Sequence, residues 1–200
     1  HVNSDLIIPV PDSGVAASIG YAEKVKKNIE LGIIRNHYVG RTFIEPTQHI
    51  RSLGVKLKHS INKTLIKNKS LVLIDDSLVR GTTSVKIIKM LYEFGAKEVH
   101  LRIASPPIKY PDYYGVDTPT EEELLASKLD LEGMRKFINA TTLQFLSIEG
   151  LYKSMGIEKR NSSYPQFTDH CFTGEYPVEP VDANDKNFKD AQLSFLSSKF

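Results

Sequence analysis

One stretch near the middle of the chain constrains the fold more than any other. In Leu71–Ser84, which reads LVLIDDSLVRGTTS, four apolar residues lead directly into two adjacent aspartates, and an arginine, a glycine and three hydroxyl residues follow. An apolar run of this length indicates a buried strand. A glycine followed by hydroxyl residues favours a tight turn into the start of a helix. The stretch therefore predicts a strand, a turn and a helix, with two carboxylates at the end of the strand.

The rest of the chain alternates between strand and helix patterns. The predicted elements, in order, are a strand at Asp5–Val10, a helix at Gly14–Lys27, a strand at Gly32–Asn36, a helix at Thr82–Phe94 and a strand at Glu98–Ser105. Such alternation is typical of α/β proteins with a mostly parallel sheet. Ligands bind at the carboxyl ends of the strands in these sheets. We therefore expect the residues that follow the predicted strands Asp5–Val10 and Leu71–Ile74 to form one site.

Composition excludes several classes of protein. The 200 residues include 26 Lys and Arg against 24 Asp and Glu, so net charge does not favour nucleic acid or an acidic membrane. No apolar run reaches membrane-spanning length, and the N-terminus lacks a signal-peptide pattern. Cys171 is the single cysteine, which excludes an internal disulfide and favours a reducing compartment. We expect a cytoplasmic globular protein without nucleic-acid or membrane partners.

The residue types after the central strand indicate a particular ligand. The hydroxyls of Thr82–Ser84 and the free N–H groups of a helix start can hold a phosphate. Ionised carboxylates at Asp75 and Asp76 would repel phosphate but accept hydrogen bonds from neutral vicinal hydroxyls. Together these groups fit a ribose 5-phosphate. A purely structural helix cap and a phosphate-accepting signalling domain are alternatives, and the second of these gives the RGTT stretch no role.

The whole stretch from Val72 to Ser84 resembles the 5-phosphoribosyl 1-pyrophosphate (PRPP) motif of the type I phosphoribosyltransferases. More narrowly, the chain resembles the C-terminal part of the amidophosphoribosyltransferases. Six further stretches carry that narrower resemblance: VPDSG at Val10–Gly14, HYVGRTFIEPTQ at His37–Gln48, SPPI at Ser105–Ile108, YYGVDTPTEEELLAS at Tyr113–Ser127, LSIEGL at Leu146–Leu151 and CFTGEYP at Cys171–Pro177.

The resemblance implies a type I phosphoribosyltransferase fold over residues 1–156, followed by a helical or irregular C-terminal extension over 157–200. It implies transfer of ammonia to C1 of PRPP, which yields phosphoribosylamine and pyrophosphate at the start of purine synthesis. In that family an N-terminal glutaminase domain supplies the ammonia from glutamine, and we expect that domain to be absent here. A phosphoribosyltransferase for nitrogenous bases and a regulator that senses PRPP or purines remain alternatives. Feedback by purine nucleotides and assembly into a homo-oligomer are further expectations.

The resemblance also implies roles for residues at the two loops. Asp12, Ser13 and Gly14 correspond to the pyrophosphate-binding loop, and Gly14 opens a helix whose dipole favours an anion. A Mg²⁺ site is implied at Ser13, Asp75 and Asp76, and Mg²⁺ prefers such oxygen ligands. The remaining substrate-binding set after the central strand is Ser77, Arg80, Gly81, Thr82, Thr83 and Ser84.

The stretch from Tyr38 to Gly54 lacks a clear period. The resemblance implies that a loop from Leu31 to about Gly54 closes over PRPP and helps to form an ammonia channel. Tyr38 and Arg41 match residues of that loop and are expected to be catalytic. The stretch from Pro46 to Ile74 contains no acidic residue. We expect phosphate contacts from Arg51, Lys56 and Lys58, with a solvated surface as the alternative.

One branch of the family holds a [4Fe–4S] cluster, which needs four thiolates. Asp112 and Thr168 stand where two of the cysteine ligands align, and Cys171 alone cannot hold the cluster. We therefore expect no iron–sulfur cluster and interpret Cys171 as a small packing residue. No histidine spacing predicts a metal site. We therefore interpret five histidines as structural or surface groups: His37, His49, His59, His100 and His170.

Overall fold

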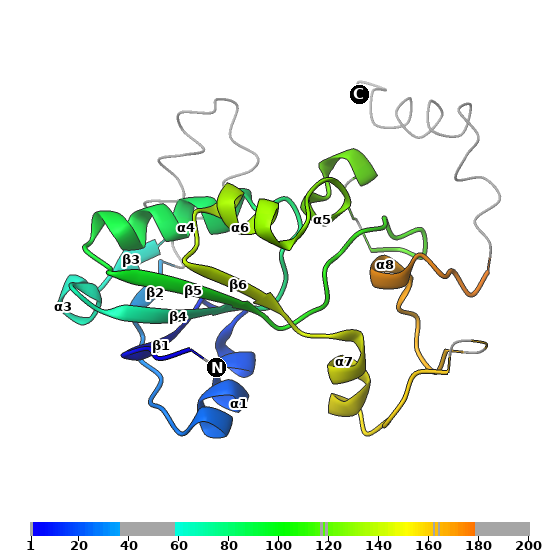
Figure 1. Cartoon of the computed structure of the whole chain (residues 1–200), viewed down its shortest axis with the longest axis horizontal. Coiled ribbons are helices and arrows are strands. Elements are labelled where there is room, and N and C mark those ends of the chain that lie inside the picture. Colours follow the sequence, from blue (N-terminus) through cyan, green and yellow to red (C-terminus); the bar gives the residue numbers. More distant parts are fainter. Residues whose placement is uncertain are drawn as a thin grey trace.

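A computed structural model describes residues 2–36, 59–116, 118, 120–161, 163 and 165–178. At its centre lies a four-stranded parallel sheet with the strand order β1-β4-β5-β6. These strands span Leu6–Pro9 (β1), Ser70–Asp75 (β4), Glu98–Ile103 (β5) and Thr142–Phe145 (β6). Helices lie on both faces of the sheet (Figure 1). The predicted α/β class and mostly parallel sheet are confirmed.

The interior position of β4 explains its continuous apolar sequence. All six residues of the strand are buried, because β1 pairs with one edge and β5 with the other while helices cover both faces. Alternate side chains enter two separate apolar clusters, with Leu71 and Leu73 in one and Val72 and Ile74 in the other. Burial of each such side chain stabilises the fold by roughly 1.5–3 kcal/mol.

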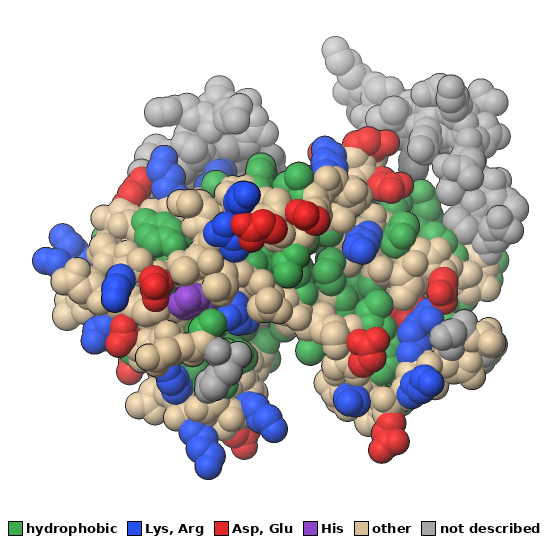
Figure 2. All heavy atoms as spheres, viewed as in Figure 1, with side chains coloured by type: hydrophobic (Ala, Val, Ile, Leu, Met, Phe, Trp, Pro, Cys, Tyr) green, Lys and Arg blue, Asp and Glu red, His purple; other side chains and the backbone are tan. Residues whose placement is uncertain are grey.

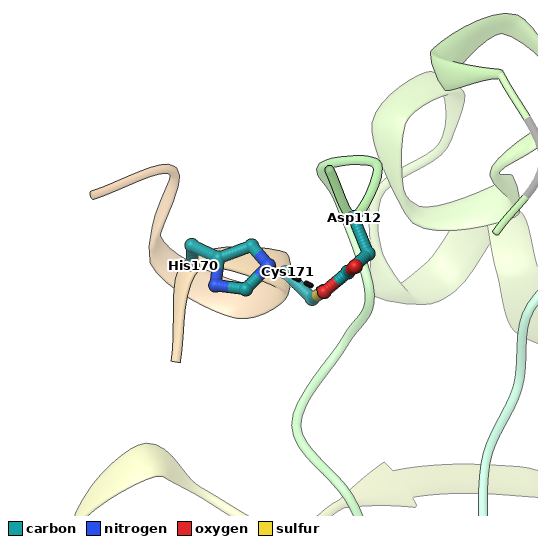
Figure 3. A group of neighbouring side chains, drawn as sticks. All are labelled: Asp112, His170 and Cys171. Atoms are coloured by element: carbon teal, nitrogen blue, oxygen red, sulfur yellow. Dashed lines mark hydrogen bonds and ion pairs between the residues drawn. The ribbon is translucent and has the colours of Figure 1, made fainter. Parts of the chain in front are cut away.

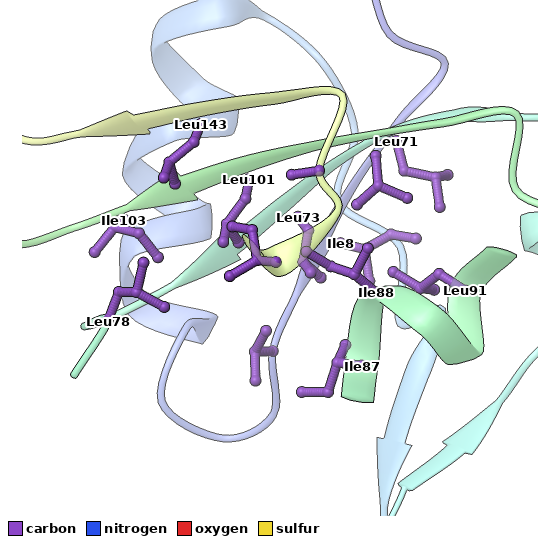
Figure 4. Packing of buried hydrophobic residues seen from close by; sticks show 14 of the residues in the cluster. Ile8, Leu71, Leu73, Leu78, Ile87, Ile88, Leu91, Leu101, Ile103 and Leu143 are labelled. Carbon is purple, nitrogen blue, oxygen red and sulfur yellow. The ribbon is translucent and has the colours of Figure 1, made fainter. Parts of the chain in front are cut away.

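The larger cluster lies between the sheet and two helices, α4 (Thr82–Glu93) and α6 (Leu131–Ile138). Apolar residues of α4 recur at helical spacing on the face that meets the sheet, and the helix stops near Gly95, which has a positive φ of 92°. Figure 4 shows the α4 side chains Ile87, Ile88 and Leu91 pointing at side chains of the sheet.

The opposite face is covered by α1 (Val15–Val25), which packs on β1 and β4. Val15 and Ile19 recur at helical spacing in the sequence, but they are 37% and 56% exposed, while Ser18 and Ala22 are buried. Small residues occupy the inner face because the helix start touches β4: a Cβ on Gly14 would lie 2.0 Å from the carbonyl oxygen of Ile74. Only glycine fits there. Further along the helix, Tyr21 and Val25 pack against the apolar cluster on this face of the sheet.

Two short strands, β2 (Ile33–Arg35) and β3 (His59–Ile61), form a separate antiparallel pair. The β2 strand was predicted and is confirmed. The remaining described elements are α3 (Lys63–Ile66), the 3₁₀ helix η2 (Glu121–Glu123), α5 (Leu125–Lys128), α7 (Ile148–Ser154) and α8 (His170–Thr173).

The C-terminal elements α7 and α8 lie beyond the end of the sheet (Figure 1). The domain boundary at residue 156 stays a prediction, and the part of the extension beyond residue 178 lies outside the described residues. None of the described helices is long and apolar enough to cross a membrane. Figure 2 shows basic and acidic side chains interspersed over one face, in keeping with the near balance of charge.

Candidate active site

A pocket of about 470 Å³ lies at the carboxyl ends of β1 and β4. The paired register of these strands sets Pro9 beside Ile74, so the loops that follow both strands leave the sheet at the same edge. The pocket is lined by Val10–Ser13 after β1, by Asp75–Ser84 from the end of β4 onward, and by Arg35 and His59 of the small antiparallel pair.

The end of β4 places one buried and one exposed carboxylate side by side. Asp75 is 7% exposed, and Asp76 is exposed. Burial raises the pKa of Asp75 to about 6, although hydrogen bonds from the Ser13 hydroxyl and the Asp76 N–H act in the opposite direction. The negative charge of Asp76 adds to the rise. The pocket therefore contains a carboxylate that is costly to ionise without a cation.

The loop after β1 contacts this carboxylate directly. Ser13 Oγ donates a hydrogen bond to Asp75 Oδ1 at 2.8 Å. Asp12 turns the other way and accepts a hydrogen bond from Arg35 Nη1 at 2.7 Å. This ion pair is partly exposed, and it brings a guanidinium group to the side of the pocket that faces the loop.

The start of α4 forms the opposite side of the pocket. Gly81 precedes the helix with a φ of 74°, a left-handed conformation that glycine adopts without strain. Its carbonyl accepts the N–H of Val85 at 2.9 Å. The N–H groups of Thr82, Thr83 and Ser84 belong to the first turn, where a helix offers no internal acceptor. Together with the helix dipole they form a site suited to an anion.

Arg80 lies at the rim of the pocket, where Nη2 donates to Glu123 Oε2 at 2.9 Å. Both side chains are about half exposed, at 52% each. The pair joins the turn after β4 to η2, and exposure makes it weak. Arg80 is therefore available at the pocket's edge at little energetic cost.

The structure brings most of the predicted site residues together. Ten of them line one pocket: Asp12, Ser13, Asp75, Asp76, Ser77, Arg80, Gly81, Thr82, Thr83 and Ser84. Gly14 lies just behind the pocket, where it allows α1 to meet β4. Five predicted residues lie outside the described part of the chain: Tyr38, Arg41, Arg51, Lys56 and Lys58. Their roles stay predictions.

Two pocket residues with ionisable side chains were missed from the sequence, Arg35 and His59. Arg35 ends the strand β2, as Asp75 ends β4, so a search for charged residues at predicted strand ends would have found it. His59 is buried at 7% exposure in β3, a strand of three residues with no recognisable pattern. No local signal in the sequence indicates its position.

The possible metal-ligand atoms at the end of β4 fit a magnesium ion. They are all oxygen atoms, from two carboxylates and the Ser13 hydroxyl, and Mg²⁺ usually binds one or two carboxylates together with substrate phosphates. Both hydrogen bonds that the described residues give to the Asp75 carboxylate end on Oδ1. The raised pKa of Asp75 marks a buried carboxylate that a cation would stabilise in its ionised form.

No family model matches the chain. An amidophosphoribosyltransferase from Rhizobium etli is 56% identical over 198 residues, which are 98% of this chain and 40% of that protein. The Bacillus subtilis amidophosphoribosyltransferase is 51% identical over 178 residues, which cover 89% of this chain and 37% of that protein. The chain corresponds to the phosphoribosyltransferase part of the amidophosphoribosyltransferases.

A solved amidophosphoribosyltransferase structure agrees with the sequence comparison. The glutamine PRPP amidotransferase from B. subtilis, complexed with ADP and GMP, superposes with a TM-score of 0.78 at 50% identity. The match covers 89% of this chain and 39% of that one. The chain thus spans about two fifths of the length of these amidophosphoribosyltransferases and has the fold of their phosphoribosyltransferase part.

A second polar cluster lies away from the pocket, at Asp112, His170 and Cys171. Burial raises the pKa of the Cys171 thiol to about 11, and the charge of Asp112 contributes to the rise. Cys171 is half-buried and faces a carboxylate, so its surroundings are more polar than its interpretation as a packing residue implied. Nothing in the histidine spacing had indicated that His170 would join it.

Proposed function

We propose that this pocket binds PRPP with Mg²⁺ and transfers ammonia to C1 of the ribose, which releases pyrophosphate and gives phosphoribosylamine. One observation carries the proposal: a single pocket is lined by an aspartate pair at one strand end and by the hydroxyl-rich start of α4. The first suits a ribose diol and the second suits its 5-phosphate, and the two are separated by one short turn.

Each group would have a separate task. Asp75 and Asp76 accept hydrogen bonds from the ribose hydroxyls, and their charge favours the positive charge that develops on the sugar ring as the C1–oxygen bond breaks. The first turn of α4 holds the 5-phosphate. The loop at Asp12–Ser13, with Arg35 beside it, holds the pyrophosphate that leaves. When bound, Mg²⁺ would neutralise charge on the pyrophosphate.

The reaction needs no nucleophilic side chain in this part of the protein. PRPP already carries a good leaving group, so the pocket has to orient the substrate, hold its charges and exclude water. The ammonia attacks C1, the C1–oxygen bond to pyrophosphate breaks, and the surplus proton of the new amine passes to solvent or to pyrophosphate.

Purine nucleotides are proposed as ligands of the same protein. The B. subtilis relative was solved with ADP and GMP. A nucleoside 5′-phosphate carries the ribose diol and 5-phosphate for which this pocket is suited, so competition with PRPP follows from shared chemistry. Assembly into a homo-oligomer, cytoplasmic location and supply of ammonia from glutamine by a further domain also remain part of the proposal.

The direct test is release of pyrophosphate from PRPP and Mg²⁺ when an ammonium salt is supplied. Free ammonia makes the assay independent of glutamine hydrolysis. The rate should rise with pH as NH₄⁺ loses its proton, and Asp76→Asn should lower it tenfold or more. Glu132→Gln, an exposed change on α6 outside the pocket, serves as the matched control.

Two outcomes would count against the proposal. Pyrophosphate release that requires a purine or pyrimidine base rather than ammonia would favour a base phosphoribosyltransferase. PRPP binding with no turnover under any nitrogen donor would favour a regulatory sensor. Both alternatives use the same pocket, so the identity of the second substrate is the deciding measurement.

A further inference from the structure

Asp112, His170 and Cys171 form a compact cluster of three side chains that all bind metals in proteins. One ligand atom from each lies within 4.8 Å of the other two. Asp112 lies in the segment after β5, whereas His170 and Cys171 are the first residues of α8. Residues 58 positions apart in the sequence therefore meet here. Figure 3 shows the imidazole, the thiol and the carboxylate converging on one point.

The carboxylate is held in position by backbone groups. Asp112 Oδ1 accepts the N–H groups of Tyr114 at 2.8 Å and Val116 at 3.0 Å. Its other oxygen, Oδ2, is the shared acceptor of His170 Nε2 at 2.7 Å and of the Cys171 thiol at 3.7 Å. Outer hydrogen bonds of this kind orient the ligands of protein metal sites.

Hydrogen bonds outside the cluster also join the segment after β5 to the segment that contains α8. The backbone N–H groups of Lys109 and Tyr110 both donate to the carbonyl of Cys171. The Tyr176 hydroxyl donates to the carbonyl of Pro111 at 2.8 Å. These bonds fix the spacing of the two segments, so the three side chains are brought together before any ion arrives.

His170 is buried and packed against aromatic rings. Its side chain is 4% exposed, and its ring lies 4.9 Å from the rings of both Tyr114 and Tyr176. Nδ1 is buried and has no hydrogen-bond partner among the described residues. The surrounding rings hold the imidazole in one orientation, with one ring nitrogen directed at the Asp112 carboxylate.

We propose that Asp112, His170 and Cys171 bind a zinc ion, each through one atom. An oxygen, a nitrogen and a sulfur ligand suit Zn²⁺, which binds them at about 2.0–2.3 Å in a tetrahedron. On binding, the thiol proton leaves to solvent, and the neutral imidazole keeps its single proton on the nitrogen that does not coordinate. A water molecule takes the fourth position. The ion would tie the start of α8 to the segment after β5.

Cobalt(II) titration of tag-free protein tests the site directly, because Co²⁺ reports zinc sites spectroscopically. Cys171 is the only cysteine of the chain, so a thiolate-to-cobalt charge-transfer band can arise only there. We expect that band and strong visible bands of tetrahedral cobalt to saturate at one equivalent and to disappear when Zn²⁺ is added. A wild-type titration without a charge-transfer band would overturn the proposal.

Variants give a second, independent reading by competition for Zn²⁺ against a coloured chelator. Cys171→Ser and Asp112→Asn should each weaken Zn²⁺ binding tenfold or more, and Zn²⁺ should raise the melting temperature of the wild type but not of Cys171→Ser. His100→Gln removes another buried histidine that lies outside the cluster and should bind as the wild type does. Equal Zn²⁺ affinity in wild type and Cys171→Ser would refute the site. If a variant fails to fold by circular dichroism, the wild-type cobalt spectrum still decides.

Discussion

Asp75 in the pocket and Asp169 in the C-terminal part are almost equally buried, with 7% and 3% of their surfaces exposed. Their pKa values nevertheless shift in opposite directions. Burial raises the pKa of Asp75 to about 6. Burial would also raise the pKa of Asp169, but hydrogen bonds from Arg160 and Tyr152 and the charge of Arg160 hold it below its ordinary value.

The two pKa values shift in opposite directions because the two carboxylates have different hydrogen-bonding partners. Asp169 binds Arg160 through two hydrogen bonds, at 2.5 and 3.1 Å, and also accepts the Tyr152 hydroxyl at 2.9 Å. Arg160 itself is only 13% exposed and also pairs with Glu175. The bonds described to the Asp75 carboxylate come from a hydroxyl and an N–H, both uncharged. A buried carboxylate that already has a cation beside it is held in its ionised form within the fold, whereas one without a cation is suited to bind a ligand that brings one.

The largest expected effect on stability comes from removing the Arg160–Asp169 ion pair. Asp169→Asn should lower the free energy of unfolding by about 3 kcal/mol, because it leaves the largely buried Arg160 without its main partner. Urea denaturation at pH 7 measures the change. Glu158→Gln, an exposed change in the same segment, should leave stability nearly unchanged. A loss below about 1 kcal/mol would mean that the Arg160–Glu175 pair suffices.

The matching change in the pocket should raise stability rather than lower it. Asp75→Asn removes a carboxylate that is costly to ionise, so it should raise the free energy of unfolding at pH 7 by on the order of 1–3 kcal/mol. The asparagine oxygen can still accept the hydrogen bond from Ser13. Stability gained together with PRPP affinity lost would mark Asp75 as a functional residue that the fold does not need. A destabilised variant would contradict the comparison.

The pH dependence sharpens this contrast. The folded-state pKa of Asp75 lies above its ordinary value, so the folded protein binds more protons than the unfolded chain from about pH 4 to 6. The stability that Asp75 contributes is present below this window and is lost as pH rises through about 6. The advantage of Asp75→Asn over wild type should therefore be larger at pH 7 than at pH 5, by about 1 kcal/mol. A constant difference across that range would show that Asp75 is not titrating there.

The smallest effect is expected at the rim of the pocket. The Arg80–Glu123 pair is 52% exposed on both sides, so Glu123→Gln should change stability by less than about 1 kcal/mol. Thermal melts at low and high salt measure the contribution, which should vanish at high salt. A larger loss would mean that η2 depends on this pair for its position.

Much of the sheet could be predicted because its strands carry local patterns. β4 is an uninterrupted apolar run because it is buried on both faces, and α4 begins at a glycine and shows helical spacing. By contrast, β6 has one fully buried residue among four, so its sequence TLQF carries no strand pattern distinctive enough to predict. Helical spacing in α1 was a partly misleading guide, because Val15 and Ile19 are exposed while the small residues Ser18 and Ala22 are buried on the inner face beside Tyr21 and Val25.

The pocket could be predicted for the same reason as the sheet. Its main residues follow directly after predicted strands, so their neighbours in sequence are also their neighbours in space. The cluster at Asp112, His170 and Cys171 depends on a contact between segments 58 residues apart, and no periodic pattern connects them. The Arg160–Asp169 pair is likewise set by the path of an irregular segment. Only the family resemblance placed Asp112 near Cys171, and neither it nor a local pattern indicated that His170 or Arg160 would take part.

Calorimetric titration of PRPP with Mg²⁺ tests the central claim most directly, namely that the aspartate pair at the end of β4 binds the ribose. A charge-assisted hydrogen bond contributes roughly 1.5–3 kcal/mol. Asp76→Asn, which is exposed and should not affect folding, is therefore predicted to weaken PRPP binding tenfold or more, while Glu132→Gln on α6 leaves it unchanged. Equal PRPP affinity in wild type, Asp75→Asn and Asp76→Asn would contradict the account.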